Sequence, residues 1–329
     1  AFVFFPVLTE PPLALDAQMR ASLADSLAHV HAVLEGRHAL QNLNLAATLA
    51  EIRAHRVLPG VFGRYYELVF ALLADHVEEA ATLFQEIAAL AARHPPFAVL
   101  PFSMDTLGSD AARYTRLLSF EAASLSDLVA PDAERWQAFE QNVHEALSLL
   151  DTIDARLGEE VRALAIQVIG ATPSPLNSGR SFGGASSLML WGAVLLNVNT
   201  HDSVVSVIAG LVHEAAHQLL FGLSLREPLV NNGIDERYNS PLRTDPRPMD
   251  GIFHATFVCA RMHYAFARLL DQASTQFDRE ALDAIARHMH DERTGFIDGY
   301  ETICRFGQIT PTGKKIMDEA SAYMQGVER

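Results

Sequence analysis

The first half of the chain repeats apolar residues every three or four positions, a spacing typical of amphipathic helices that bury one face. Glycine and proline mark the ends of these stripes. Gly36 follows the first, a Pro-Pro pair at 95–96 ends the second, and Pro131 opens the third. The stripes predict three long helices, over residues 16–35, 64–93 and 131–157. We therefore expect the first half to form a helical scaffold.

The pattern changes after Gly158. Residues 164–169 are apolar and partly β-branched, as in a buried strand, and residues 172–184 are rich in Pro, Ser, Asn and Gly, as in a loop. Residues 188–199 predict one bent strand or a tight hairpin, with Gly192 as the irregularity. A small sheet is thus expected before the next helix.

That next helix carries the most informative motif. Asp202 or Ser203 can cap a helix that runs to Leu220, with Gly222 just past its end. The helix contains the run His213-Glu214-Ala215-Ala216-His217. Histidines at i and i+4 share one face, so both imidazoles can bind one cation, while the glutamate projects to the side. The helix therefore offers a bidentate metal site; the alternative is a helix that buries two hydrogen-bonded histidines.

A catalytic metal needs a third protein ligand and an open position. Glu236 stands nineteen residues beyond His217, a spacing similar to that of thermolysin-like zinc peptidases. Its surroundings argue against it, because residues 231–248 are crowded with Asn, Gly and Pro and predict a loop. His254 begins a further predicted helix, over 249–270. We favour His254 as the third ligand and keep Glu236 as the alternative.

Three arginines are candidates for binding an anionic cosubstrate. Arg261 lies seven residues after His254, so the two side chains share a helix face and stand about 10 Å apart along the axis. A short dicarboxylate can bridge a metal at one end and a guanidinium at the other. Arg243 and Arg247 precede this helix on a proline-stiffened loop and can serve the cosubstrate or the substrate. The alternative for Arg261 is a contact with solvent or a nearby acid.

Composition narrows the class of protein. The 329 residues are 49% hydrophobic and 20% charged, which indicates a soluble globular protein and excludes disordered or low-complexity chains. The net charge of −15 disfavours nucleic acid and anionic membranes as partners. Cys259 and Cys304 show no disulfide pattern, and residues 1–8 lack the features of a signal peptide. We expect a cytoplasmic protein without a membrane anchor.

These elements predict a mainly α fold with a small β-sheet (α+β). The expected division is a helical scaffold over 1–158 and a metal-binding catalytic region over 159–329, joined in one continuous globular unit. In the second region, a zincin-like strand precedes the helix with the His-Glu-x-x-His motif.

The runs around the motif resemble one family, the HExxH motif-containing peptide-modification proteins of bacterial natural-product clusters. Members of that family are iron(II)- and 2-oxoglutarate-dependent oxygenases. The resemblance implies that dioxygen is used to oxidise an unactivated side-chain carbon, most often by β-hydroxylation, in an amino acid or in a peptide such as a ribosomal precursor peptide. It is specific over 182–261 and is carried by Phe182-Gly183-Gly184-Ala185-Ser186-Ser187, the strand with Asn197 and Asn199, the motif itself, the loop over 238–248, and Gly251-Ile252-Phe253-His254-Ala255.

The resemblance implies that His213 and His217 hold Fe(II); the spacing along the chain adds His254 as the third ligand and Arg261 as a cosubstrate partner, and 2-oxoglutarate and dioxygen take the remaining positions. Glu214, the catalytic candidate, then orients the substrate or a metal ligand and is not a peptidase base. Arg261 is the favoured partner for the far carboxylate of 2-oxoglutarate.

Two other classes of protein are compatible with the motif. In a zinc-dependent HExxH metallopeptidase, Glu214 would activate water bound to Zn(II), with Glu236 or His254 as the third ligand. A non-catalytic helical binding protein would retain the histidines as a relic metal site. Turnover of 2-oxoglutarate with Fe(II), peptide cleavage with Zn(II), or neither activity separates the three classes.

Overall fold

The computed structural model describes residues 12–34, 44–119, 125, 127–174, 182–240 and 245–326. Helices dominate these residues and a small mixed sheet accompanies them, which confirms the predicted mainly α class with a small β-sheet. The chain divides into two compact units. Among the described residues, the sheet unit comprises 12–143 and 160–202, and the histidine unit comprises 144–159 and 203–326.

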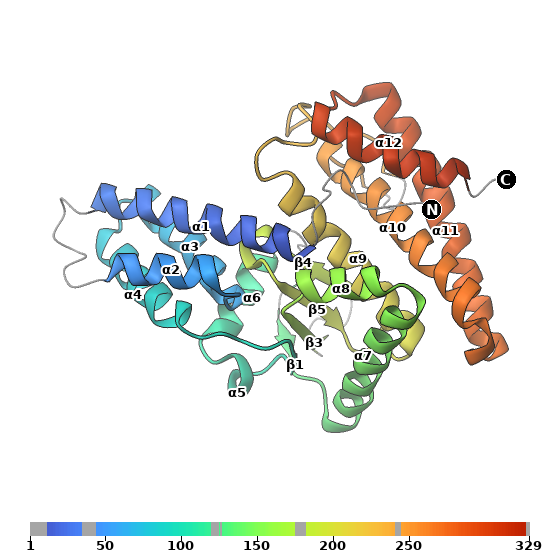
Figure 1. The fold of residues 1–329 in the computed structure, drawn as a ribbon, viewed down its shortest axis with the longest axis horizontal. Coiled ribbons are helices and arrows are strands. Elements are labelled where there is room, and N and C mark those ends of the chain that lie inside the picture. Colours follow the sequence, from blue (N-terminus) through green and yellow to red (C-terminus); the bar gives the residue numbers. More distant parts are fainter. Residues whose placement is uncertain are drawn as a thin grey trace. The chain divides into compact units, whose positions relative to one another are not determined.

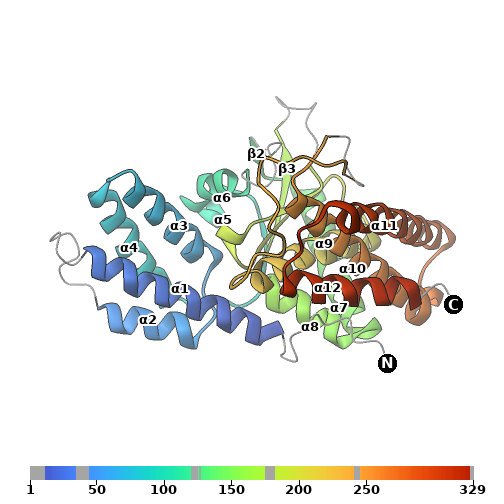
Figure 2. The same cartoon turned by 90° about the horizontal axis from the view of Figure 1, so that it is seen from above.

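Most helices of the sheet unit come from the N-terminal part of the chain, and Figures 1 and 2 show α1 to α4 side by side. The helix expected over 16–35 is α1; Gly36 lies outside the described residues. Leu27, Ile52 and Phe84 are fully buried on α1, α2 and α4. The helices are α1 (Pro12–Leu34), α2 (Leu45–Ala54), α3 (Pro59–Leu73), α4 (Val77–Ala91), α5 (Met104–Leu107), α6 (Asp110–Leu118), the start of α7 (Ala133–Ile153) and the end of α8 (Ala155–Leu164).

The single helix expected over 64–93 is wrong, because the structure has α3 and α4 with a turn between them. Asp75 in this turn has a φ of 60°, a left-handed conformation that an α-helix cannot include. The amide of His76 donates to the carbonyl of Ala71 and closes the end of α3. The turn allows the apolar faces of α3 and α4 to pack against each other, which one straight helix could not do.

The sheet has three parallel strands, β1, β3 and β5; β4 pairs antiparallel with β5, and the short β2 pairs antiparallel with β3. β5 is buried throughout and β3 nearly so, as in strands covered on both faces. The irregularity expected at Gly192 is confirmed, since its φ is 91° directly before β5. The strands are β1 (Ala98–Pro101), β2 (Leu128–Val129), β3 (Gln167–Pro173), β4 (Gly184–Ser186) and β5 (Ala193–Asn197).

Two strand boundaries differ from expectation. The strand expected over 164–169 starts only at Gln167, because Leu164 is the last residue of α8 and two residues connect the helix to the strand. The strand or hairpin expected over 188–199 begins as a short 3-10 turn, Leu188–Leu190, whose amide at Met189 is capped by the hydroxyl of Ser187. Local hydrogen bonding at the cap therefore competes with strand formation there.

The division into units also differs from the expected boundary after residue 158. β1 pairs in parallel with β3, from Ala98 opposite Gln167 to Pro101 opposite Gly170. Because β1 precedes that boundary and β3 follows it, the sheet joins the N-terminal helices to residues that the sequence pattern had assigned to the catalytic region.

The histidine unit is built on the long helix α10, which packs against α9, α11 and α12; Figures 1 and 2 show α10 and α11 side by side. The helix expected over 131–157 is broken at Asp154. The carboxylate of Asp154 accepts hydrogen bonds from the amide of Arg156 and from the hydroxyl of Tyr264. The helices are α9 (Val204–Leu223), α10 (Met249–Ala273), α11 (Arg279–Phe306), α12 (Pro311–Gly326), the end of α7 and the start of α8.

Helix α9 carries the His-Glu-x-x-His motif. Ser203 is the N-cap and forms a reciprocal pair of hydrogen bonds with Ser206, and the helix continues past the expected end at Leu220 to Leu223. By length and composition α9 could cross a membrane, but 67% of its most apolar stretch is buried inside the protein. Such burial is that of a core helix in a soluble protein.

Candidate metal centre

Two histidines of α9 lie one turn apart on the same face of the helix, as their i, i+4 spacing requires. Nε2 of His213 lies 3.3 Å from Nε2 of His217, and the ring centroids are 5.0 Å apart. Both histidines are partly exposed, whereas the three residues between them are buried. The pair therefore occupies the accessible side of a helix that is otherwise largely buried.

His254 comes from the first turns of α10 and lies beside His217. The Nδ1 atoms of the two rings are 3.2 Å apart, and the rings are nearly parallel, at 18°, with centroids 5.5 Å apart. Burial lowers the pKa of His254, and the carboxylate of Asp250, 4.0 Å from its Nε2, opposes this effect. A neutral imidazole is the form that a metal ligand or a hydrogen-bond acceptor requires.

The distance between His213 and His217 fits two ligands of one divalent ion. A histidine nitrogen binds such an ion at about 2.0–2.1 Å, so two ligands of one ion stand about 3.0–3.4 Å apart. The two contacts measure 3.3 and 3.2 Å, but His217 meets His213 through Nε2 and His254 through Nδ1. His213 and His217 are thus arranged to share an ion as they stand, whereas His254 reaches His217 on its other nitrogen.

The contact also suits a supporting role for His254. If His217 donates its Nδ1–H to Nδ1 of His254, the bond sets the tautomer of His217 and leaves its Nε2 free for the metal. The ring of Phe221 lies near both histidines, with centroids 6.4 Å from His217 and 5.3 Å from His254. The sequence pattern did not single out Phe221 and Asp250. Their four-residue offsets from the two histidines, along the same helices, are the signal that would have identified them.

The two glutamates singled out by the sequence differ in their surroundings. Glu214 is 5% exposed on α9. Glu236 is exposed in the loop after α9, and its carboxylate accepts hydrogen bonds from the hydroxyl of Tyr238, from the amide of Gly233 at 3.0 Å and from the side chain of Asn232 at 3.3 Å. The bond from Tyr238 is the main cause of the lowered pKa of Glu236. These contacts bind Glu236 to its own loop and disfavour it as the third ligand.

Arg261 is more buried than Arg247. It is 2% exposed and shares α10 with His254. Burial raises the pKa of Tyr264 to about 12 and also raises that of Tyr323, while the positive charge of Arg261 lowers both. The guanidinium therefore lies close to two phenol groups within the histidine unit.

The other two candidate arginines, Arg247 and Arg243, belong to the loop before α10. Arg247 pairs with Asp245, with 3.0 Å between Nε and Oδ2, and its backbone bridges to Tyr238. Arg243 lies outside the described residues. The described part of the loop therefore gives Arg247 a carboxylate partner of its own.

We expect His254→Ala to lose bound iron and Glu236→Ala to retain it, because only His254 lies beside the motif. Iron per chain, measured by elemental analysis after loading without oxygen, tests both variants. His254→Asn separates the two roles of His254, since an amide can replace the hydrogen bond to Nδ1 of His217 but is a weak iron ligand. Full iron in His254→Asn would assign His254 to positioning; full iron in His254→Ala would remove it from the site.

Comparisons with known proteins add no family. No protein-family model matches the chain, and no curated protein matches it significantly. The function must therefore be inferred from the residues of the chain itself.

Proposed function

We propose that the chain is an iron(II)- and 2-oxoglutarate-dependent oxygenase of natural-product biosynthesis that oxidises an unactivated side-chain carbon of an amino acid or peptide. The observation that carries the proposal is the gathering of His213, His217 and His254 where α9 packs on α10. Imidazole nitrogens suit iron as well as zinc. The resemblance of residues 182–261 to the oxygenase family favours iron.

The chain's own residues supply the positioning. His213 and His217 present two nitrogen ligands from a capped, largely buried helix, so their spacing is preorganised. The ring of Phe221 lies against two of the histidines and reduces the access of water to them. Glu214 is assigned to orienting a ligand or the substrate. When bound, iron with 2-oxoglutarate would supply the oxidation of a C–H bond by dioxygen.

Arg261 is assigned to the cosubstrate. It stands seven residues along α10 from His254, which corresponds to about 10 Å, a distance that a five-carbon diacid bound to the metal can approach with its far carboxylate. A buried guanidinium binds a carboxylate through charge-assisted hydrogen bonds that water screens little. The burial of Arg261 therefore supports this role over that of an arginine in contact with solvent.

We place the reaction in the cytoplasm. Cys259 and Cys304 are both free thiols in the structure, as a reducing compartment favours. The net charge of −15 further favours a small-molecule or peptide substrate over nucleic acid.

Metal-dependent turnover tests the proposal. The chain, stripped of metal and loaded with Fe(II), should convert 2-oxoglutarate to succinate in air even without substrate, at a slow uncoupled rate. An amino acid or peptide that fits the site should accelerate this conversion and gain the mass of one oxygen. The matched sample loaded with Zn(II) and given the same peptides tests the alternative. Peptide cleavage by the zinc form, with no succinate from the iron form, would replace the oxygenase by a metallopeptidase.

A further inference from the structure

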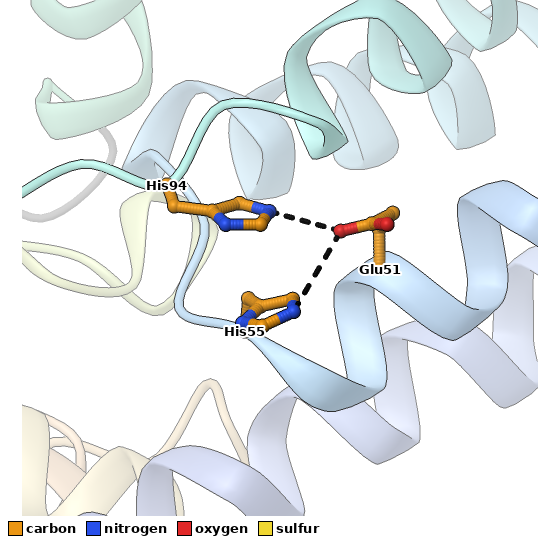
Figure 3. A group of neighbouring side chains, drawn as sticks. All are labelled: Glu51, His55 and His94. Carbon is orange, nitrogen blue, oxygen red and sulfur yellow. Dashed lines mark hydrogen bonds and ion pairs between the residues drawn. The ribbon is translucent and has the colours of Figure 1, made fainter.

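A second group of possible metal ligands lies in the sheet unit. Glu51 and His55 stand at the end of α2, four residues apart, and His94 follows α4. Figure 3 shows both histidine rings directed toward the same carboxylate oxygen of Glu51. Nε2 of His94 lies 2.9 Å and Nε2 of His55 lies 3.9 Å from Oε2 of Glu51.

The three side chains converge more closely than a simple ion pair requires. One ligand atom from each of the three lies within 4.8 Å of the other two. The rings of His55 and His94 are stacked, with centroids 4.0 Å apart and an angle of 22° between their planes. One imidazole suffices to pair with a carboxylate. The presence of a second imidazole is therefore explained better by a cation that all three side chains bind than by an ion pair with Glu51.

The backbone around these ligands is held in place. The amide of His55 donates to the carbonyl of Glu51 at 2.9 Å, and His94 precedes Pro95, which restricts its backbone to extended conformations. The carbonyl of Ile52 accepts a hydrogen bond from buried Arg20 at 2.9 Å, which anchors the end of α2 to α1. The ligands are therefore positioned by the fold before any ion binds.

We propose that Glu51, His55 and His94 form a divalent cation site of the zinc class, which shares no residue with the histidines of α9 and α10. Two imidazoles and one carboxylate are a ligand set that zinc accepts, and a set of three leaves a position for water. The side chains are 40 to 49% exposed, so an ion can reach them from solvent. A bound ion would connect the end of α2 to the segment after α4 and so stabilise the sheet unit.

Zinc titration of the full chain tests this site. To separate it from the proposed iron centre, the titration uses the His213→Ala/His217→Ala double variant after removal of metal by chelation. We expect one zinc per chain in this background by equilibrium dialysis and elemental analysis. Adding His94→Ala should weaken zinc binding by at least about a hundredfold, since even the loss of an outer-shell partner costs tenfold to a hundredfold. Zinc should also raise the unfolding temperature of the double variant and leave that of the triple variant unchanged.

His76→Ala is the matched control. His76 is exposed and lies 3.4 Å from Glu79 in a histidine–glutamate pair, so its loss should leave zinc binding unchanged. The same His94→Ala change in the otherwise unaltered chain should reduce bound zinc by one equivalent, which tests the site even if the double variant fails to fold. Equal zinc with and without His94, or no zinc in a folded double variant, overturns the proposal. Neither result depends on whether the chain is an oxygenase.

Discussion

In a chain that carries His94→Ala, and so lacks the Glu51 site, His213→Ala and His217→Ala should each reduce bound iron from about one ion per chain to less than about a tenth of that amount. Removal of either histidine leaves at most two nitrogen ligands, which are too few to retain an exchangeable divalent ion during desalting. The two Nε2 atoms lie 3.3 Å apart and can bind the same ion. Each variant therefore removes one of these two ligands. Elemental analysis after anaerobic loading and desalting measures the loss.

His290→Ala is the control for this experiment. His290 is an exposed histidine of α11 in the same unit, and its replacement should leave the iron content unchanged. Circular dichroism establishes that each variant retains its helices. Stoichiometric iron in either α9 variant would show that the motif does not form the metal centre, and the proposed function would fall with it.

Arg261→Leu should weaken 2-oxoglutarate binding while iron remains bound. If Arg261 holds the far carboxylate, the variant loses a charge-assisted pair of about 1.5–3 kcal/mol, which corresponds to roughly tenfold to hundredfold weaker binding. The cosubstrate titrated without oxygen into the iron-loaded chain gives a metal-to-ligand charge-transfer band whose midpoint reports this affinity. A 2-oxo acid without the second carboxylate should bind the variant as well as it binds the unaltered chain.

Arg247→Leu and Arg243→Leu are the comparisons for Arg261→Leu. Arg247 already pairs with Asp245, so its replacement should move the midpoint little. Because Arg261 is buried, the unfolding temperature of Arg261→Leu is measured first, and Arg261→Lys provides a variant that keeps the charge and loses the two-pronged geometry. An unchanged midpoint in a folded Arg261→Leu chain would assign Arg261 to packing near Tyr264 and Tyr323 instead.

Helix patterns were the part of the fold that the sequence predicted best. The helix expected from residue 16, the capped helix with the motif and the helix from Met249 all form, although the last two end three residues later than expected. The breaks at Asp75 and Asp154 were missed, because each depends on one residue whose conformation or side-chain bonds interrupt an apolar stripe that would otherwise continue. The spacing of apolar residues indicates which face of a helix is buried. It does not locate the residue at which one helix ends and the next begins.

The local features of the candidate sites follow from the amino-acid sequence, because they depend on residues within one helical turn or two. The i, i+4 pair of His213 and His217 and the position of Arg261 on the helix of His254 are of this kind. Contacts between distant segments depend on the tertiary structure. It brings His254 to Nδ1 of His217, and in the sheet unit it brings His94 to Glu51, 43 positions away. The separation of two residues in the sequence does not predict such contacts, because the contacts depend on how the buried faces of the helices pack.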